Sequence, residues 1–273
     1  MTAKKNINVP FLKWAGGKAK IIDRIKAQMP EGHRLIEPFC GSATVFLNTD
    51  YQENLIADTN HDVINIYQHI QREKEDFLEY SRQLFKPESN NADFYYEQRK
   101  EFNDTKDKRL RAALFLYLNK HGYNGLCRYN SSGGFNVPFG KYKKVTFPEK
   151  YIINFIKKAN HAEFIVQDYE TTMLSARTGD VIYCDPPYVP LNASNSSFRY
   201  VEKIFSMKQQ EELAQLARQT AQRGIPVLVS NHLTDFTQEI YAGAEITQFS
   251  VRRSISCKAE QREKASELLA LFN

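Results

Sequence analysis

The sequence contains few cysteines and no long apolar run. Its four cysteines, at positions 40, 127, 184 and 257, form no Cys-x-x-Cys pair and no metal-ligand spacing, which argues against a disulfide framework and against a zinc site. No stretch approaches the roughly 20 apolar residues that span a bilayer, and residues 1–10 lack the apolar core of a secretory signal. We therefore expect a cytoplasmic protein with no membrane partner and no metal site.

Basic residues are concentrated in one segment. Lys and Arg number 37 against 32 Asp and Glu, a net charge of +5. Between Lys108 and Pro148 there are eight basic residues and no acidic one, which leaves −3 for the rest of the chain. Such a segment indicates a polyanionic partner, or alternatively a solvated basic helix followed by a polar loop.

Short apolar strands alternate with helical patterns over much of the chain, and there is no internal repeat, low-complexity tract or proline-rich linker. This alternation predicts a parallel sheet covered by helices. The expected helices run through residues 45–47, 63–70 and 207–222. The expected strands are residues 34–37, 54–58, 163–166, 180–184 and 226–230.

The middle of the chain has a different pattern. Residues 74–159 show several helices and a long polar loop, with no strand pattern strong enough to join the sheet. We therefore predict an α/β fold with a doubly wound, mostly parallel sheet. Residues 1–73 and 160–273 would form its catalytic domain, and 74–159 an inserted, mainly helical recognition subdomain.

The sharpest motif is Asp185-Pro186-Pro187-Tyr188, which directly follows the strand expected at 180–184. Open α/β folds bind ligands at this carboxyl edge of the sheet. An aromatic exocyclic amine is a poor nucleophile because its lone pair is delocalised into the ring. The Asp185 carboxylate and the Pro186 carbonyl can accept its two hydrogens and free that lone pair, while Tyr188 offers a face for base stacking. Alternatively, an acid and two prolines simply end a strand.

A second strand-to-helix turn lies at Glu37–Ser42, and Asp58 ends the next strand. A glycine in the turn lets a ligand approach the backbone, and an acid about 20 residues further on can accept both hydroxyls of a ribose. Together they suit an adenosine-bearing cofactor. The glycine turn by itself is equally typical of a plain strand-to-helix connection.

Residues 11–18 contain the chain's only tryptophan, Trp14, beside two glycines and two lysines. They lack the GxxxxGK[ST] spacing, so the segment is not a phosphate-cradling loop. Trp14 is either a cofactor contact or an ordinary core aromatic, and Lys18 can pair with a cofactor carboxylate.

Residues 119–144 are rich in Gly and Asn, interleaved with aromatic and basic residues. Such a loop offers amides and guanidinium groups to base edges and lysines to phosphates, and Arg128 suits a guanine. A surface hairpin without function is the alternative.

Taken together, these motifs resemble the Dam-type DNA adenine methyltransferases, which transfer a methyl group from S-adenosylmethionine to the amino group of adenine in GATC. The resemblance covers nearly the whole chain. It rests on Phe11–Lys18, Glu37–Phe39, Asp58, Gly122–Asn130, Phe135–Gly140, Asp185–Tyr188, Ser230–His232 and Arg252–Ser254.

The resemblance implies roles for individual residues. Asp185, Pro186 and Tyr188 would serve catalysis on a flipped adenine in double-stranded DNA, by a protein expected to be a monomer. S-adenosylmethionine would be bound by Trp14, Lys18, Phe39, Asp58, Asp168 and Asp185. DNA would be bound by Lys13, Tyr123, Asn124, Leu126, Arg128, Asn130, Pro138, Lys141, Lys143 and Lys144.

Two positions depart from the family's pattern. Ala43 stands where relatives often have a second glycine, which puts the geometry of the cofactor turn in question. Lys141 stands where relatives have arginine, which keeps the charge and loses the bidentate fork.

Two other functions remain open at this stage. One is a methyltransferase of the same fold that acts on cytosine, RNA or a protein amide, although such enzymes tend to carry Ser or Asn in place of Asp185. The other is a DNA-binding regulator that has kept the fold without catalysis.

Overall fold

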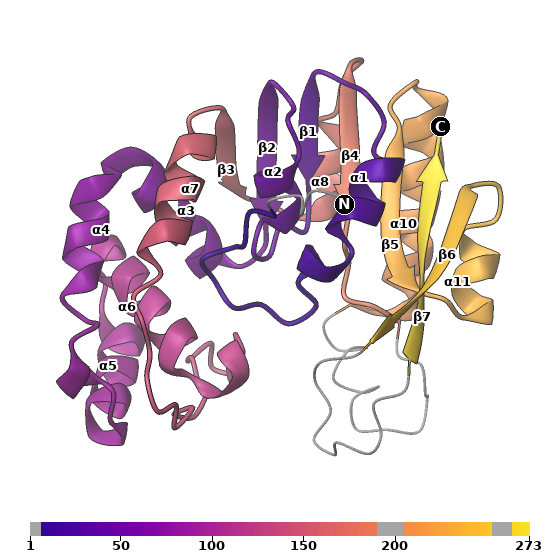
Figure 1. Ribbon diagram of the computed structural model, residues 1–273. Coiled ribbons are helices and arrows are strands. Elements are labelled where there is room, and N and C mark those ends of the chain that lie inside the picture. Colours follow the sequence, from indigo (N-terminus) through magenta and orange to yellow (C-terminus); the bar gives the residue numbers. More distant parts are fainter. Residues whose placement is uncertain (1–6, 190–204, 253–263) are drawn as a thin grey trace, which may run out of the picture. The chain divides into compact units, whose positions relative to one another are not determined.

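The computed structural model describes residues 7–189, 205–252 and 264–273 (Figure 1). The chain divides into two compact units. The first unit comprises the chain up to Lys20, Gly41–Thr49 and Asp58–Val166. The second comprises Ile21–Cys40, Asp50–Ala57 and the chain from Gln167 onward.

The second unit contains most of the sheet. Its strands are adjacent in the order β2-β1-β4-β5-β7-β6, and β2 ends at Asp58, the first residue of a first-unit segment. The first four strands in this order are mutually parallel, whereas β7 is antiparallel to both β5 and β6. The bounds are β1 Arg34–Glu37, β2 Glu53–Asp58, β4 Asp180–Cys184, β5 Val227–His232, β6 Glu245–Arg252 and β7 Lys264–Phe272.

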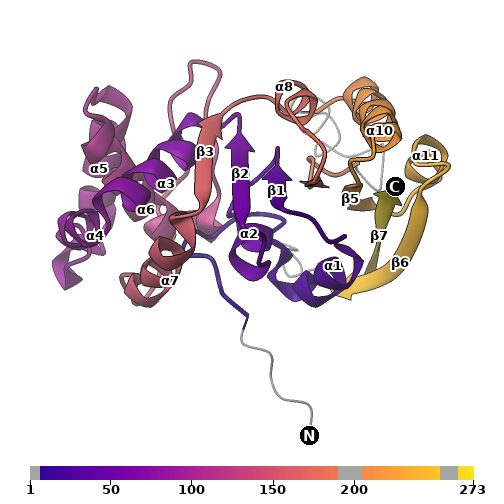
Figure 2. The same cartoon turned by 90° about the horizontal axis from the view of Figure 1, so that it is seen from above.

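The central strands β4 and β5 are buried along almost their whole length, and most of their residues are apolar. Every residue of β4 is buried, as are all but the last of β5, as expected for parallel strands with helices on both faces. Figure 2 shows α1 on one face of these strands and α8 and α10 on the other. The helices of this unit are α1 Ile22–Gln28, α8 Tyr169–Leu174, α10 Met207–Gln222 and α11 Asp235–Ile240.

An ion pair joins β1 and β4 at their amino ends. Arg34 and Asp180 are register partners, and the guanidinium donates to both carboxylate oxygens, over 2.9 Å from Nε and 2.6 Å from Nη2. Asp180 is buried, so this bidentate geometry compensates for the loss of water around its charge.

The first unit is mainly helical. Asn60 begins α3 and Asp107 begins α6, because each side chain accepts hydrogen bonds from two backbone N–H groups of the first turn. Its elements are η1 Lys18–Lys20, α2 Thr44–Asn48, α3 His61–Glu73, α4 Glu75–Arg82, η2 Pro87–Ser89, α5 Ala92–Asp104, α6 Lys108–His121, η3 Tyr123–Gly125, α7 Glu149–Ala159 and β3 Ala162–Val166.

Aromatic side chains fill the core of this unit. Tyr67 on α3 stacks on Phe155 on α7 with ring centroids 4.8 Å apart, and Phe11 meets the same phenyl ring edge-on at 5.1 Å. The Tyr67 hydroxyl donates to the carbonyl of Gly41 over 2.6 Å. The aromatic core therefore holds the backbone of the glycine turn at Gly41 through this hydrogen bond.

The expected strands and helices are confirmed, with shifts of one to three residues at several ends, as is the mainly helical character of residues 74–159. Strands β6 and β7 were not expected. The predicted division into a catalytic domain and an insert stays a prediction. Among the described residues, no helix combines the length and hydrophobicity that a membrane crossing requires.

Candidate functional site

The second unit brings the ends of three parallel strands to one edge. Ile36 of β1 pairs in register with Ile182 of β4, and Glu37 pairs with Ile56 of β2. The segments that follow these strands, including Phe39 and Asp185, therefore lie at the same carboxyl edge. This is the edge at which open α/β sheets bind their ligands.

The glycine turn fits closely against Trp14 in the first unit. Gly41 has φ of +45°, and a Cβ built on it would lie 2.5 Å from Trp14 Nε1 and 2.9 Å from Cδ1. Only glycine is compatible with both the backbone conformation and the indole ring. Trp14 is half-buried, so it is neither a fully enclosed core residue nor a surface one.

Asp58 ties the glycine turn to the start of α3. Its Oδ2 accepts a hydrogen bond from the Gly41 N–H, and its Oδ1 accepts one from the Asn60 N–H, each over 2.9 Å. These two bonds fix the orientation of the carboxylate at the turn.

Ala43 adopts the left-handed conformation in this turn, with φ of 55° and ψ of 38°, and precedes α2 as its cap. The side chain is fully buried. Alanine is strained in this region by about 1–2 kcal/mol, which the surrounding core must offset. The turn therefore keeps a glycine-like backbone with a methyl group in it.

Lys18 lies in η1 with only 7% of its surface exposed. Its Nζ donates to the carbonyl of Gly16 over 2.6 Å. A buried lysine interacts strongly with an anionic group of a ligand, because little water lies between the two charges to weaken their attraction.

Phe39 belongs to an aromatic cluster of the second unit. Tyr169 stacks on Phe39 at 5.4 Å, and Phe205 meets both rings edge-on at 5.6 and 5.5 Å. Asp168 precedes Tyr169 and caps α8, since its Oδ1 accepts from the Thr171 N–H over 2.8 Å. This backbone hydrogen bond lowers the pKa of the Asp168 carboxyl.

Asp185 is half-buried at the end of β4. Ser230 on β5 donates from Oγ to Asp185 Oδ1 over 2.9 Å. Pro186 is buried, and Tyr188 places its ring edge-on to His232 at 4.8 Å. Burial raises the pKa of the Tyr188 phenol, which stays protonated.

The backbone after Asp185 is held by α10 and β5. Gln210 donates from Nε2 to the Pro187 carbonyl over 2.7 Å, and the Val189 N–H donates to Asn231 Oδ1 over 3.0 Å. Asn231 is fully buried and donates in turn to Gln210 Oε1. These contacts fix the path of the motif on both sides of Tyr188.

Lys13 supports the first turn of the polar loop in the first unit. Its Nζ donates to the Lys120 carbonyl over 2.8 Å and lies 3.9 Å from the centre of the Tyr142 ring. A Cβ on Gly125 would lie 2.2 Å from the Cβ of Lys13, so the turn packs directly on this side chain. Burial lowers the pKa of Lys13.

The remaining predicted DNA contacts lie mostly on the surface. Arg128 is exposed, with Nε donating to Asn136 Oδ1 over 2.7 Å, and Asn130 Oδ1 accepts from the Gly134 N–H over 2.8 Å, which shapes the tip of a hairpin. Leu126 is half-buried. The exposed side chains are those of Tyr123, Asn124, Arg128, Asn130, Pro138, Lys141, Lys143 and Lys144.

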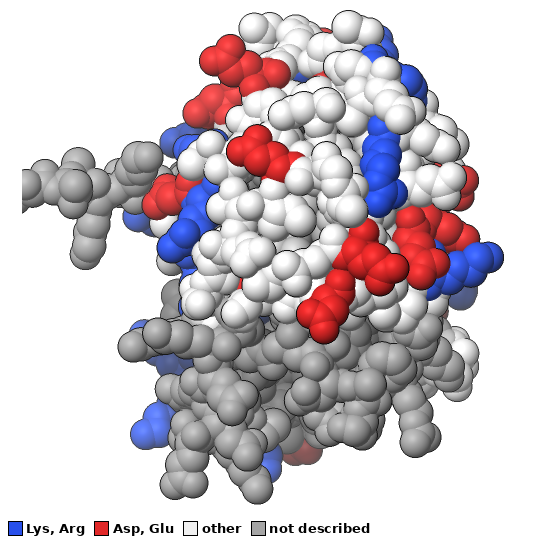
Figure 3. Space-filling model, turned by 90° about the vertical axis from the view of Figure 1, so that its right-hand side faces the viewer, with Lys and Arg blue, Asp and Glu red and all other residues white. Residues whose placement is uncertain are grey.

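Charge is distributed differently in the second unit. On the side at the right of Figure 1, where β6 and α11 lie, basic and acidic side chains are interspersed among uncharged ones (Figure 3). The run of basic residues without an acid, from Lys108 to Pro148, belongs to the first unit.

The structure thus groups the predicted residues within each unit. In the first, Trp14 and Asp58 contact the glycine turn, and Lys13 contacts the polar loop. In the second, Phe39 and the residue after Asp168 share an aromatic cluster. Arg253 and Ser254, which contribute to the resemblance, lie outside the described residues.

Several residues that contact the candidate site residues or the hairpin around Arg128 were given no role from the sequence. They are Asp62, Tyr129, Tyr169, Phe205, Gln210, Ser230 and Asn231. Of these, Ser230 and Asn231 carried a signal, because two polar residues end an apolar strand there, as Asp185 follows another. The others are far from their partners in sequence.

The fold and these residues define a class: a Rossmann-like α/β protein whose ligand edge carries an acid-proline-proline-tyrosine motif after a central strand. The chain belongs to the D12 class of N6 adenine-specific DNA methyltransferases, which residues 14–255 match. It is therefore an adenine-specific DNA methyltransferase, and S-adenosylmethionine is the methyl donor of this class. The expected enzyme class and cofactor are confirmed.

Several curated relatives are similar over almost their full length. The DNA adenine methylase of Escherichia coli strain K12 is 48% identical over 265 residues, which cover 97% of this chain and 95% of the relative. That of Serratia marcescens is 47% identical, with 97% and 98% covered. That of Vibrio cholerae strain N16961 is 45% identical, with 96% and 95% covered.

One solved structure is a distant match. Precorrin-8w decarboxylase of Methanobacterium thermoautotrophicum aligns with a TM-score of 0.39 at 10% identity, over 95% of this chain and 93% of the other. A likeness at this level carries no argument about function.

Proposed function

We propose that the enzyme methylates the 6-amino group of adenine within GATC in double-stranded DNA, after the adenine has been flipped out of the helix. The observation that carries the proposal is the Asp185 carboxylate, held by Ser230 over 2.9 Å at the carboxyl edge of parallel strands. A paired amino group inside a duplex cannot reach such a carboxylate, so flipping is required.

The residues around the glycine turn fit the adenosyl part of S-adenosylmethionine. Asp58 is held beside the glycine turn by hydrogen bonds from two backbone N–H groups, and its carboxylate would accept the ribose hydroxyls. By the resemblance to the family, Trp14 would contact the cofactor, and Phe39 and Asp168 would line its pocket. Lys18 would pair with the carboxylate of the methionine part.

Catalysis would depend on positioning the amine. When bound, S-adenosylmethionine supplies an electrophilic methyl group on a sulfonium. The Asp185 carboxylate and the Pro186 carbonyl would each accept one hydrogen of the adenine amine, which draws the nitrogen toward tetrahedral geometry. Tyr188 would stack on the base and hold the amine in place for methylation, in which one amine hydrogen is replaced and leaves as a proton.

Sequence recognition would fall to the polar loop of the first unit. Arg128 suits bidentate donation to a guanine, and Lys13, Tyr123, Asn124, Leu126, Asn130 and Pro138 would complete the contacts to the bases. Lys141, Lys143 and Lys144 would neutralise phosphates without reading the sequence.

We also propose that the enzyme is a cytoplasmic monomer. A single chain carries candidate residues for cofactor binding, catalysis and base reading, so no second copy is needed to complete the set. Sedimentation equilibrium in the presence and absence of DNA tests the oligomeric state.

A labelled-methyl transfer assay tests the proposal. The substrates are two duplexes of equal length, one with a single GATC and one with the same bases scrambled. We expect transfer to the GATC duplex alone, with the label on N6 of adenine, and loss of transfer with retained DNA binding in Asp185→Ala. Equal transfer to both duplexes would remove the specificity claim, and full activity of Asp185→Ala would remove the catalytic one.

A further inference from the structure

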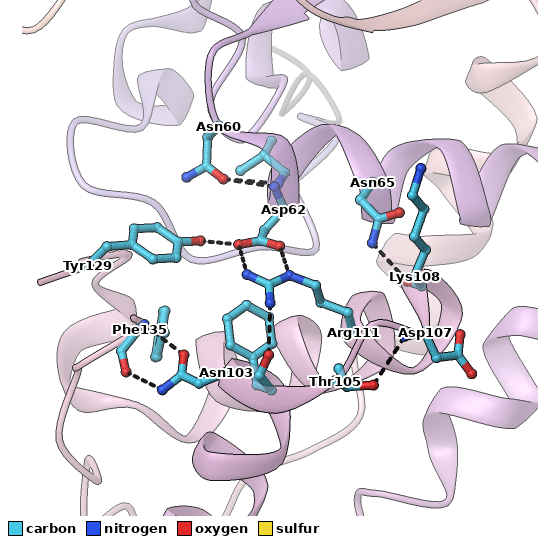
Figure 4. A network of polar contacts seen from close by, with 12 residues as sticks. Asn60, Asp62, Asn65, Asn103, Thr105, Asp107, Lys108, Arg111, Tyr129 and Phe135 are labelled. Carbon is cyan, nitrogen blue, oxygen red and sulfur yellow. Dashed lines mark hydrogen bonds and ion pairs between the residues drawn. The ribbon is translucent and has the colours of Figure 1, made fainter. Parts of the chain in front are cut away.

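The hairpin that carries Arg128 is anchored to helix α3 by the next residue in the chain. Tyr129 donates from its hydroxyl to Asp62 Oδ2 over 2.6 Å (Figure 4). Asp62 lies in the first turn of α3 and is 5% exposed. A buried carboxylate that accepts a phenol hydrogen at this distance forms a strong, directional bond.

Arg111 of α6 holds the same carboxylate from the other side. Its Nε donates to Asp62 Oδ1 over 2.5 Å and its Nη2 to Oδ2 over 3.0 Å. The third nitrogen, Nη1, donates to the Phe102 carbonyl over 2.8 Å. The guanidinium thus makes three hydrogen bonds, two of them to Asp62, and these orient the carboxylate that accepts the Tyr129 hydroxyl.

The opposite arm of the hairpin is anchored independently. Asn103 of α5 accepts from the Phe135 N–H over 2.8 Å and donates to the Phe135 carbonyl over 3.2 Å. Tyr129 and Phe135 form a bridge across the hairpin, with their rings 5.7 Å apart. The two arms are therefore held to α3 and α5 by different contacts.

Neighbouring side chains of an extended segment face opposite ways. Tyr129 points into the unit, and the preceding Arg128 is exposed, with its guanidinium held against Asn136. The backbone from which Arg128 projects is therefore placed by the seating of the Tyr129 ring, and Asn136 holds the guanidinium at its end.

The amino end of α3 also adjoins the candidate cofactor turn at Gly41, because Asp58 accepts hydrogen bonds from both Gly41 and Asn60. Asn60 follows Asp58 by two residues, caps α3, and donates from Nδ2 to Cys127 Sγ over 3.4 Å. The first turn of α3 thus contacts the hairpin at two successive inward-facing residues, Cys127 and Tyr129.

We propose that Tyr129 is a positioning residue for sequence recognition, which acts by fixing Arg128 through the hydrogen bond of its hydroxyl to Asp62. The inference rests on the proposed role of Arg128 in reading GATC. It assigns Tyr129 no contact with DNA, cofactor or the reacting atoms.

The test is the discrimination ratio, defined as kcat/KM on a duplex with one GATC divided by kcat/KM on a duplex with one base pair of that site changed. Tyr129→Phe removes only the hydroxyl and should lower this ratio about 3- to 30-fold, mainly through faster methylation of the altered site and a higher KM for GATC. The affinity for S-adenosylhomocysteine should stay unchanged.

Tyr117→Phe is the matched control. The Tyr117 hydroxyl is buried in the same unit and donates to the Ser89 carbonyl over 2.8 Å, away from the hairpin. Both variants lose one hydrogen bond of a tyrosine hydroxyl, but only Tyr129→Phe should change the ratio. An equal change in both variants would overturn the proposal, since the effect would then be general loosening.

A double variant tests whether Tyr129 acts through Arg128. Adding Tyr129→Phe to Arg128→Ala should leave the ratio of Arg128→Ala unchanged, because the positioned group is already gone. Additive losses would overturn the proposal. If Tyr129→Phe does not fold, Asp62→Asn tests the bond from its acceptor side and should also lower the ratio.

Failure of the inference is distinguishable from failure of the proposed function. If wild-type enzyme shows no preference for GATC, or Arg128→Ala leaves the ratio unchanged, the proposed function fails. If Arg128→Ala lowers the ratio and Tyr129→Phe does not, only the role of Tyr129 fails.

Discussion

Ser230 donates a hydrogen bond from Oγ to Oδ1 of Asp185 over 2.9 Å, across the gap between strand β5 and the end of β4. The same Oγ lies 3.0 Å from the hydroxyl of Tyr183, which is buried. The carboxylate is therefore oriented by the strand next to it, before any substrate binds. Preorganised acceptors of this kind need no rearrangement at the moment of reaction.

We expect Ser230→Ala to lower kcat for adenine methylation about 10- to 100-fold, since a hydrogen bond to a charged group contributes roughly 1.5–3 kcal/mol. The KM for DNA should change little, because Asp185 itself remains. Single-turnover methyl transfer on a GATC duplex measures the effect on chemistry apart from product release.

Ser81→Ala is the matched control for this variant. Ser81 is fully buried in α4, and its hydroxyl has no hydrogen-bond partner among the described residues. This substitution should leave kcat unchanged and stabilise the protein by up to about 1 kcal/mol. A wild-type kcat in Ser230→Ala would show that the Asp185 carboxylate is held by other contacts.

Gly41→Ala should disrupt the candidate cofactor turn. The new Cβ would lie 2.5 Å from Trp14 Nε1, so the indole must move. Trp14 is the only tryptophan of the chain, and its intrinsic fluorescence therefore reports on this turn directly. We expect an altered emission maximum and an affinity for S-adenosylhomocysteine reduced at least about 10-fold, or about 1.4 kcal/mol.

Gly224→Ala separates the clash from backbone strain. Gly224 also has a positive φ, of +77°, but no atom lies within 4 Å of a Cβ built there. It should cost about 1–2 kcal/mol in stability and leave both Trp14 emission and cofactor affinity as in the wild type. Equal loss of affinity in the two variants would contradict a specific role for the Trp14–Gly41 contact.

The parallel core was predictable because its strands are short apolar runs that end in chemically distinctive residues, such as Asp58 and Asp185. Strand β7 was not. Its sequence, Lys264–Phe272, is rich in Leu and Ala, which favour a helix when considered locally. Antiparallel pairing with β5, such as Val229 with Ala270, overrides that preference.

The candidate site residues also fall into two groups: those that a contiguous motif marks, and those that only the fold brings together. Motifs that are contiguous in sequence predict roles for Asp185, Trp14 and the polar loop, and these roles stay predictions. The bond between Asp62 and Tyr129 joins residues 67 positions apart. No local pattern marks such a pair, since an acid in the first turn of a helix is common and a tyrosine in a hairpin is equally ordinary.

His121 predicts a specific pH dependence of stability. It is 1% exposed and stacks on Tyr117 with ring centroids 4.0 Å apart. Burial lowers the pKa of its imidazole to about 4. The unfolded chain therefore takes up a proton near its ordinary pKa of about 6.5, whereas the folded protein resists protonation until about pH 4.

The contribution of His121 to stability is consequently complete above pH 6.5 and is lost as the pH falls toward 4, by about 3 kcal/mol in all. Urea unfolding at pH 7.5 and pH 5 measures this loss. His121→Phe keeps an aromatic ring beside Tyr117 and should flatten the decline, whereas His61→Gln, at an exposed position, should leave it unchanged. The same decline in all three proteins would assign it to other groups.

Lys143 and Arg128 should differ in what they contribute to DNA binding. Both are exposed in the first unit, but a lysine that neutralises a phosphate acts on any sequence, whereas a bidentate arginine reads a base. Lys143→Ala should reduce the slope of log Kd against log salt concentration by about 0.9 and leave discrimination unchanged. Arg128→Ala should reduce discrimination by about 1–3 kcal/mol. Lys150→Ala, on the exposed start of α7 outside the basic segment, should change neither quantity. Similar behaviour of the Lys143 and Arg128 variants would mean that the loop does not divide phosphate binding from base reading in this way.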